Sequence, residues 1–114
     1  MSEVLEKARA AKATTTVLAG LTTREKNEAL AAMADALVNH ADKIIAVNEE
    51  DLTRGREQGI TASLLDRLKL TQERIAGIAE SINQIIELPD PVGDTLDKFA
   101  RPNGMHIEKI RVPL

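Results

Sequence analysis

Cysteine, tryptophan and tyrosine are absent from the chain, and Phe99 is its single aromatic residue. Without cysteine, these residues can form no disulfide, no thiolate metal site and no cysteine nucleophile. Proteins that bind single-stranded nucleic acid stack bases on aromatic rings, so the lack of aromatics argues against that class. No apolar run approaches the roughly 18 residues of a membrane-spanning helix. We therefore expect neither a nucleic-acid partner nor a membrane partner.

What the chain does contain is typical of a globular protein, with 43% hydrophobic and 29% charged residues. The net charge is −3, and lysine and arginine are scattered among the acids rather than gathered into a basic stripe. Met1-Ser2-Glu3 opens with an acid instead of a basic leader. The sequence predicts a cytoplasmic protein whose core consists of leucine, isoleucine, valine, alanine and methionine.

Apolar residues recur at helical spacing in five stretches, so the fold is predicted to be mainly α. The first helix should begin at Ser2, which can cap free amides, and end at Gly20 in the left-handed conformation. The second should begin at Thr22, which has the capping-box spacing to Glu25.

The third helix has two candidate N-caps, Asn39 and Asp42, and Gly55 and Gly59 mark its decay into a turn. Thr61 and Thr71 are the predicted caps of a short fourth helix and a long fifth helix. Leu88-Pro89-Asp90-Pro91 should end the fifth helix, because proline disfavours helical geometry in the residue before it. The fifth helix has the strongest stripe, with Ile82 predicted to be buried at its centre. The stripe consists of Ile75, Ile78, Ala79, Ile82, Ile85 and Ile86.

Residues 95–114 change to strand chemistry. The turn Pro102-Asn103-Gly104 could fold residues 96–101 against residues 105–112 as a hairpin. The alternation of apolar residues slips near Glu108-Lys109, which a β-bulge or a strand buried on both sides would explain. Because an isolated hairpin is marginal in water, we expect these strands to be paired or disordered: they should associate with a second copy, exchange between protomers, or fray. Residues 1–94 are thus read as an N-terminal helical segment, and residues 95–114 as a strand segment leading into a part of the protein outside the chain.

Few polar residues suggest a site. His40 and His106 are far apart in sequence and lack a ligand pattern, so each is read as a solvated or capping histidine rather than a metal ligand. Asn48 lies on an otherwise apolar helix face, where a buried amide must find partners. It is expected to bond a neighbouring helix end or loop carbonyl, and the alternative is a contact with a domain outside the chain.

The charged runs have equally simple interpretations. Consecutive residues on a helix point in different directions, so the three acids 49–51 are read as a solvated face. For the same reason Asp66 and Arg67 are expected to reach different partners rather than each other. Neither a glycine-rich phosphate loop nor a nucleophile with its base is present. The sequence therefore predicts no catalytic, cofactor-binding or metal residue in this chain.

Four strings in a fixed order resemble the N-terminal quarter of the gamma-glutamyl phosphate reductase family, also called glutamate-5-semialdehyde dehydrogenase, within the aldehyde dehydrogenase superfamily. The resemblance covers essentially the whole chain. The strings are Asn48-Glu49-Glu50-Asp51-Leu52, Leu64-Leu65-Asp66-Arg67-Leu68-Lys69-Leu70-Thr71, Leu88-Pro89-Asp90-Pro91-Val92-Gly93, and Arg101-Pro102-Asn103-Gly104 leading to Arg111-Val112-Pro113-Leu114.

The resemblance implies an α/β fold, of which this helical part flanks the cofactor domain, and an NADPH-dependent oxidoreductase of proline biosynthesis. In that family a cysteine thiolate attacks the acyl phosphate of L-glutamate 5-phosphate, phosphate leaves, and NADPH reduces the thioester to the semialdehyde. Neither the nucleophile nor the nucleotide site can be carried onto a residue here, so the fragment itself should be inactive. Its partners would be the remainder of its own polypeptide and further copies in a homo-oligomer.

A second interpretation is a free-standing helical interaction module. Such a module would dimerise through the isoleucine face of residues 71–87.

Overall fold

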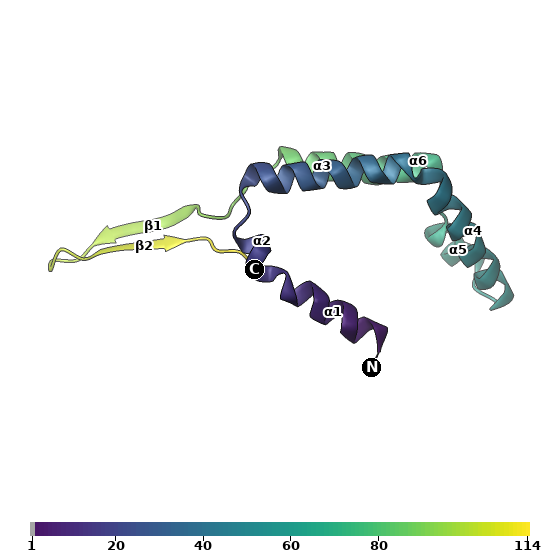
Figure 1. The fold of residues 1–114 in the computed structure, drawn as a ribbon, viewed down its shortest axis with the longest axis horizontal. Helices are drawn as coiled ribbons and strands as arrows, with labels where there is room; N and C mark the ends of the chain where they lie inside the picture. The colour runs from purple at the N-terminus through teal and green to yellow at the C-terminus, as the bar shows by residue number, and fades with distance from the viewer. Residues whose placement is uncertain (1) are drawn as a thin grey trace. The chain divides into compact units, whose positions relative to one another are not determined.

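The computed structural model describes residues 2–114 and consists mainly of helices followed by a β-hairpin (Figure 1). This confirms the predicted fold class. In chain order the elements are α1 (Glu3–Ala13), α2 (Thr15–Ala19), α3 (Thr23–Asn39), α4 (Ala41–Glu57), α5 (Ala62–Leu68), α6 (Gln72–Glu87), β1 (Thr95–Ala100) and β2 (His106–Ile110).

The described residues form two compact units. One comprises Arg24–Leu88, which holds nearly all of α3 to α6, and the other comprises the residues before Arg24 together with Pro89–Leu114. Within the second unit, the two separate stretches of chain are linked by a hydrogen bond of 2.8 Å from the Thr23 hydroxyl to the Asp90 carboxylate. The division into a helical segment and a strand segment at residue 95 stays a prediction.

The core lies within the helical unit and is small. In it, α4 packs against both α5 and α6. Only Leu52 of α4 and Ile75 of α6 are large side chains with essentially no exposed surface. The other buried apolar side chains are alanines, at positions 34, 41 and 79. Small residues let neighbouring helices approach closely but contribute little buried apolar area.

Three helices begin as the sequence predicts, because the hydroxyl of each cap accepts a hydrogen bond from the backbone amide three residues later. The distances are 3.3 Å for Ser2, 3.4 Å for Thr61 and 3.1 Å for Thr71. Each bond satisfies one of the amides that have no partner inside the helix. α6 ends at Glu87, directly before Leu88-Pro89, which confirms the predicted stop.

The first predicted helix is divided at Thr14 into α1 and α2. The Thr14 hydroxyl donates to the Ala11 carbonyl at 2.7 Å, and the Thr15 hydroxyl donates to the Lys12 carbonyl at 2.9 Å. Such local bonds compete with the helical backbone ladder. The predicted left-handed stop at Gly20 is wrong, because Gly20 keeps φ at −89°. Its amide reaches the Val17 carbonyl at 3.1 Å, a tight right-handed closure.

The predicted caps of the third helix are also wrong. Asn39 is the last residue of α3, and His40 takes the N-cap position of α4 without a side-chain capping bond. Asp42 lies inside α4, where its carboxylate accepts a hydrogen bond of 2.6 Å from the side-chain amide Nε2 of Gln72. Thr22 directly precedes α3, and its capping box with Glu25 stays a prediction.

The two glycines at the end of α4, Gly55 and Gly59, have different structural roles. Gly59 has φ of +77°, and the amide of Ile60 donates to the Gly55 carbonyl at 3.0 Å, as in a Schellman motif. Gly55 is buried, and a Cβ placed there would lie 3.0 Å from Cδ2 of Leu65. The missing side chain therefore lets α5 lie close against α4.

The isoleucine stripe of α6 is buried only in the first half of the helix, at Ile75 and Ala79. Ile75 is buried, whereas Ile82 and Ile86 are half-buried and Ile78 and Ile85 are exposed. The prediction of a fully buried Ile82 is wrong. The bond from Gln72 to Asp42 joins α6 to α4 near the first turn of α6, and burial falls along the helix from there.

The hairpin follows the predicted turn, with β1 and β2 antiparallel and the Arg101 amide donating to the Met105 carbonyl at 2.7 Å. The register shifts between Thr95 and Asp97, so the irregularity lies at Leu96 in β1. The expected irregularity near residues 108–109 is confirmed as a register shift opposite Lys109 and Ile110, with the extra residue in β1 rather than in β2. All residues of both strands are exposed except Ile107, which is half-buried.

Candidate docking surface

Asn48 connects α4 to the segment between α5 and α6. Its side chain is 7% exposed, Nδ2 donates to the Leu68 carbonyl at 3.0 Å, and Oδ1 accepts from the Leu70 amide at 2.8 Å. The side-chain amide thus acts as a peptide group would, with one donor and one acceptor both satisfied. This confirms the expected bond to a helix end, and it holds Leu70 beside α4.

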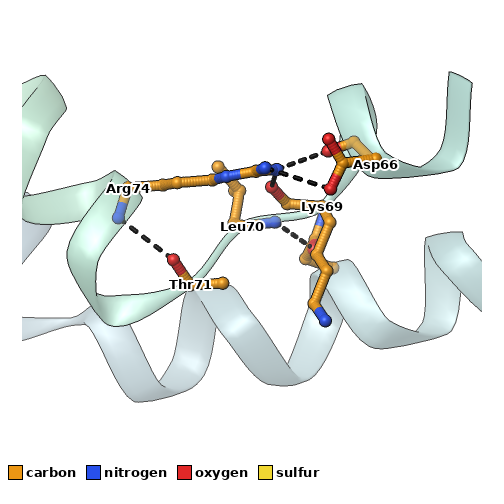
Figure 2. Close-up of polar contacts among 6 residues, drawn as sticks. Asp66, Lys69, Leu70, Thr71 and Arg74 are labelled. Atoms are coloured by element: carbon orange, nitrogen blue, oxygen red, sulfur yellow. Dashed lines mark hydrogen bonds and ion pairs between the residues drawn. The ribbon is translucent and has the colours of Figure 1, made fainter. Parts of the chain in front are cut away.

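Arg74 stabilises the end of α5 from the first turn of α6 (Figure 2). Its guanidinium donates to the Asp66 carbonyl, to the Lys69 carbonyl at 2.7 Å and to the Asp66 carboxylate at 3.1 Å. A cation in the first turn of a helix is unfavourable to its own dipole, so these acceptors explain why arginine is placed there. Asp66 therefore pairs with Arg74. The sequence predicted that Asp66 would not pair with the adjacent Arg67, and this is confirmed.

The role of Arg74 was missed by sequence reasoning. A possible signal was its position three residues after the Thr71 cap, where an acidic residue is usually favoured. A basic residue at that position indicates acceptors outside its own helix. Arg67 is exposed on α5.

Two acidic residues of α4 form separate ion pairs with basic residues of the same helix. Glu49 lies 3.3 Å from Arg56, and Asp51 lies 2.8 Å from Arg54. These exposed pairs contribute little to stability, in agreement with a solvated face. Among residues 2–114 no group of three or more histidine or acidic side chains could hold a metal ion. His106 is exposed in β2, opposite Ala100.

Two apolar cavities lie along α4. One, of about 380 Å³, is lined by residues of α3 and α4 and by His40 between them. The other, of about 330 Å³, is lined by residues of α4 and by Leu70, and the two share Ile44. We call these two cavities the α3–α4 groove. Its lining residues are Met33, Ala36, Leu37, His40, Lys43, Ile44, Val47, Asn48, Asp51 and Leu70.

The groove is suited to binding apolar side chains rather than to chemistry. Met33 is 56% exposed and Val47 is 52% exposed, although burying apolar surface would gain about 25 cal/mol per Å². Lys43 and Asp51 are the charged residues of its lining. No nucleophile with an adjacent base is found in it. An unpartnered apolar surface of this kind is typical of an interaction site.

Comparison with known proteins shows which proteins this chain resembles. No family model matches the chain. Over all 114 residues it is 47% identical to gamma-glutamyl phosphate reductase of Anoxybacillus flavithermus and 48% identical to that of Halalkalibacterium halodurans. It is homologous to the N-terminal quarter of gamma-glutamyl phosphate reductase. The chain spans 28% and 27% of the lengths of these two reductases.

A solved gamma-glutamyl phosphate reductase has the same fold over this region. The crystal structure of the enzyme from Thermotoga maritima superposes with a TM-score of 0.92 and 38% identity, over 98% of this chain and 27% of that chain. The elements from α1 to β2 therefore have counterparts in a solved reductase chain. Within residues 2–114, no helix is both long enough and apolar enough to cross a membrane.

Proposed function

We propose that this chain is the N-terminal part of a cytoplasmic reductase that converts L-glutamate 5-phosphate to L-glutamate 5-semialdehyde with NADPH in proline biosynthesis. The observation that carries the proposal is the match to gamma-glutamyl phosphate reductases over the entire chain, together with the TM-score of 0.92 to a solved one. The segment would contribute a helical scaffold, and the reaction would depend on residues outside it.

The described residues do not offer a fit for NADPH. Nucleotide-binding turns place several backbone amides around a phosphate, but the glycines with positive φ lie in three separate turns, at positions 59, 93 and 104. The α3–α4 groove is lined mostly by apolar side chains. The catalytic cysteine expected from the family must also lie elsewhere, because this chain has none. We therefore assign the cofactor and the nucleophile to the remainder of the enzyme.

The α3–α4 groove is then the surface on which the remainder of the same polypeptide docks. Two facts support this role. Its apolar side chains Met33 and Val47 are more than half exposed, and nearly three quarters of the solved relative lies outside the matched region. Filling the groove with apolar side chains from that remainder would remove Met33 and Val47 from water.

Complementation tests this proposal. The 114-residue chain would be mixed with a separately produced remainder of the Anoxybacillus flavithermus reductase, and NADPH oxidation by glutamyl phosphate would be followed. Neither part alone should be active, and the mixture should be. If both parts fold and the mixture stays inactive, the proposed division of roles is wrong.

A matched pair of variants locates the docking surface. Val47 lines the groove and is 52% exposed, whereas Val38 of α3 is 53% exposed and does not line it. Val47→Asp should raise the concentration of chain needed for activity at least about tenfold, since a charge would enter an apolar contact. Val38→Asp should change it little. Equal effects of the two variants would show that docking uses another face.

A dimerisation module is the second candidate, and the exposed isoleucines of α6 favour it. Ile78 is 44% exposed and Ile85 is 52% exposed, so this face could pair with a second copy. The mass of the natural gene product separates the candidates, because the reductase requires a chain several times longer. A homo-oligomer of the complete enzyme is also proposed, with the exposed hairpin as its contact.

A further inference from the structure

The tip of the hairpin contains an asparagine followed by a glycine in an exposed turn. Gly104 has φ of +85°, and Asn103 is exposed. The turn is closed by the Gly104 amide, which donates to the Arg101 carbonyl at 2.9 Å, while Oδ1 of Asn103 accepts from the Met105 amide at 3.1 Å. The side-chain amide and the following backbone nitrogen are thus near neighbours on the surface.

We propose that Asn103 is a site of spontaneous deamidation through a cyclic imide formed with Gly104. The backbone nitrogen of Gly104 loses its proton to solvent base and attacks Cγ of Asn103. The new bond joins this nitrogen to Cγ, the bond from Cγ to Nδ2 breaks, and Nδ2 leaves as ammonia. Water then opens the ring at either carbonyl, which yields aspartate or isoaspartate. The reaction needs only water, and it is independent of the proposed function.

Glycine is what makes this position reactive. Gly104 has no side chain to hinder ring closure, and a Cβ built there would meet nothing within 4 Å, so the space on that side of the residue is open. The other four asparagines lie in helices, at positions 27, 39, 48 and 83. Each is followed by a residue with a side chain, and backbone amides in helices are held in the hydrogen-bond ladder. Deamidation should therefore be selective for Asn103.

The turn slows the reaction only modestly. The bonds from Gly104 to Arg101 and from Met105 to Asn103 must open before the nitrogen can reach Cγ. Both are exposed bonds, and bonds of this type contribute little net stability. Together they should slow the reaction by no more than about 30-fold relative to an unstructured peptide. Loop tips of this kind also open locally far more often than the core.

The two products would change the hairpin differently. Aspartate keeps the main chain intact and adds one negative charge beside the turn. Isoaspartate routes the main chain through the former side-chain carbon, so an extra atom enters the connection between β1 and β2. This would disturb the bond from the Arg101 amide to the Met105 carbonyl, now 2.7 Å, which is the pair that closes the hairpin.

The test is peptide mapping by mass spectrometry after incubation of the full chain at mildly alkaline pH. Trypsin should release residues 99–109 as one peptide, because proline follows Arg101. A synthetic peptide of the same residues gives the unstructured rate. We expect the chain to react within about 30-fold of the peptide, faster at higher pH, and with aspartate and isoaspartate forms resolved by chromatography. Asn103→Gln should abolish the change, since its imide ring would have to be six-membered.

Two results would overturn the proposal. One is that Asn103 in the folded chain reacts more than about 30-fold more slowly than the peptide, which would mean that the turn protects it. The other is that Asn83, an exposed helical asparagine, deamidates as fast as Asn103.

Discussion

Removing the side-chain amide of Asn48 should detach the segment between α5 and α6 from α4. Asn48→Ala deletes the donor to the Leu68 carbonyl and the acceptor for the Leu70 amide, at 3.0 and 2.8 Å. Each hydrogen bond contributes a net of about 1 kcal/mol, so the two together contribute about 2 kcal/mol. Alanine is the better helix former by about 0.5 kcal/mol. The expected net loss in the free energy of unfolding is therefore about 1.5 kcal/mol.

Asn83→Ala is the matched control, because Asn83 is an exposed asparagine in the helix α6. It should stabilise the chain by about 0.5 kcal/mol from helix propensity alone. Urea denaturation followed by far-UV circular dichroism measures both variants. Hydrogen exchange adds a local readout, since the Leu70 amide should lose its protection only in the Asn48 variant. A loss below about 0.5 kcal/mol for Asn48→Ala, with Leu70 still protected, would refute the bridging role.

Four further outcomes are expected. Ile75→Ala should lower the free energy of unfolding by about 2 to 5 kcal/mol, because Ile75 is only 2% exposed. Ile82→Ala should lower it distinctly less, because Ile82 is half-buried. Equal losses in chemical denaturation would contradict the decrease of burial along α6. Gly77→Ala should raise the free energy of unfolding by about 0.5 to 1 kcal/mol, since a Cβ there meets nothing within 4 Å. Calorimetric titration of the chain with NADPH should give no detectable binding, and micromolar affinity would contradict the assignment of the cofactor site to other residues. Light scattering should show that cutting the chain back to Val92 abolishes any self-association driven by the open strand edges; an unchanged dimer would move the contact to the helices.

Local signals explain the elements that could be predicted. A capping hydroxyl and the amide it accepts from are three residues apart, so the starts at Ser2, Thr61 and Thr71 depend on sequence alone. The same holds for Leu88-Pro89, where the proline ring acts on the residue before it, and for the turn at Pro102-Asn103-Gly104. The sequence also showed that Asn48 must find partners, because the cost of an unpaired buried amide does not depend on the fold.

Only the tertiary structure decided which surfaces are covered and which partners the polar groups find. Helical periodicity aligns Ile82 with Ile75, but burial depends on where the neighbouring helix packs, and α6 is joined to α4 near its first turn. The partners of Asn48 and Arg74 lie in segments whose approach is set by packing, not by spacing along one helix. The α3–α4 groove depends on two helices at once, so no pattern within either helix could reveal it.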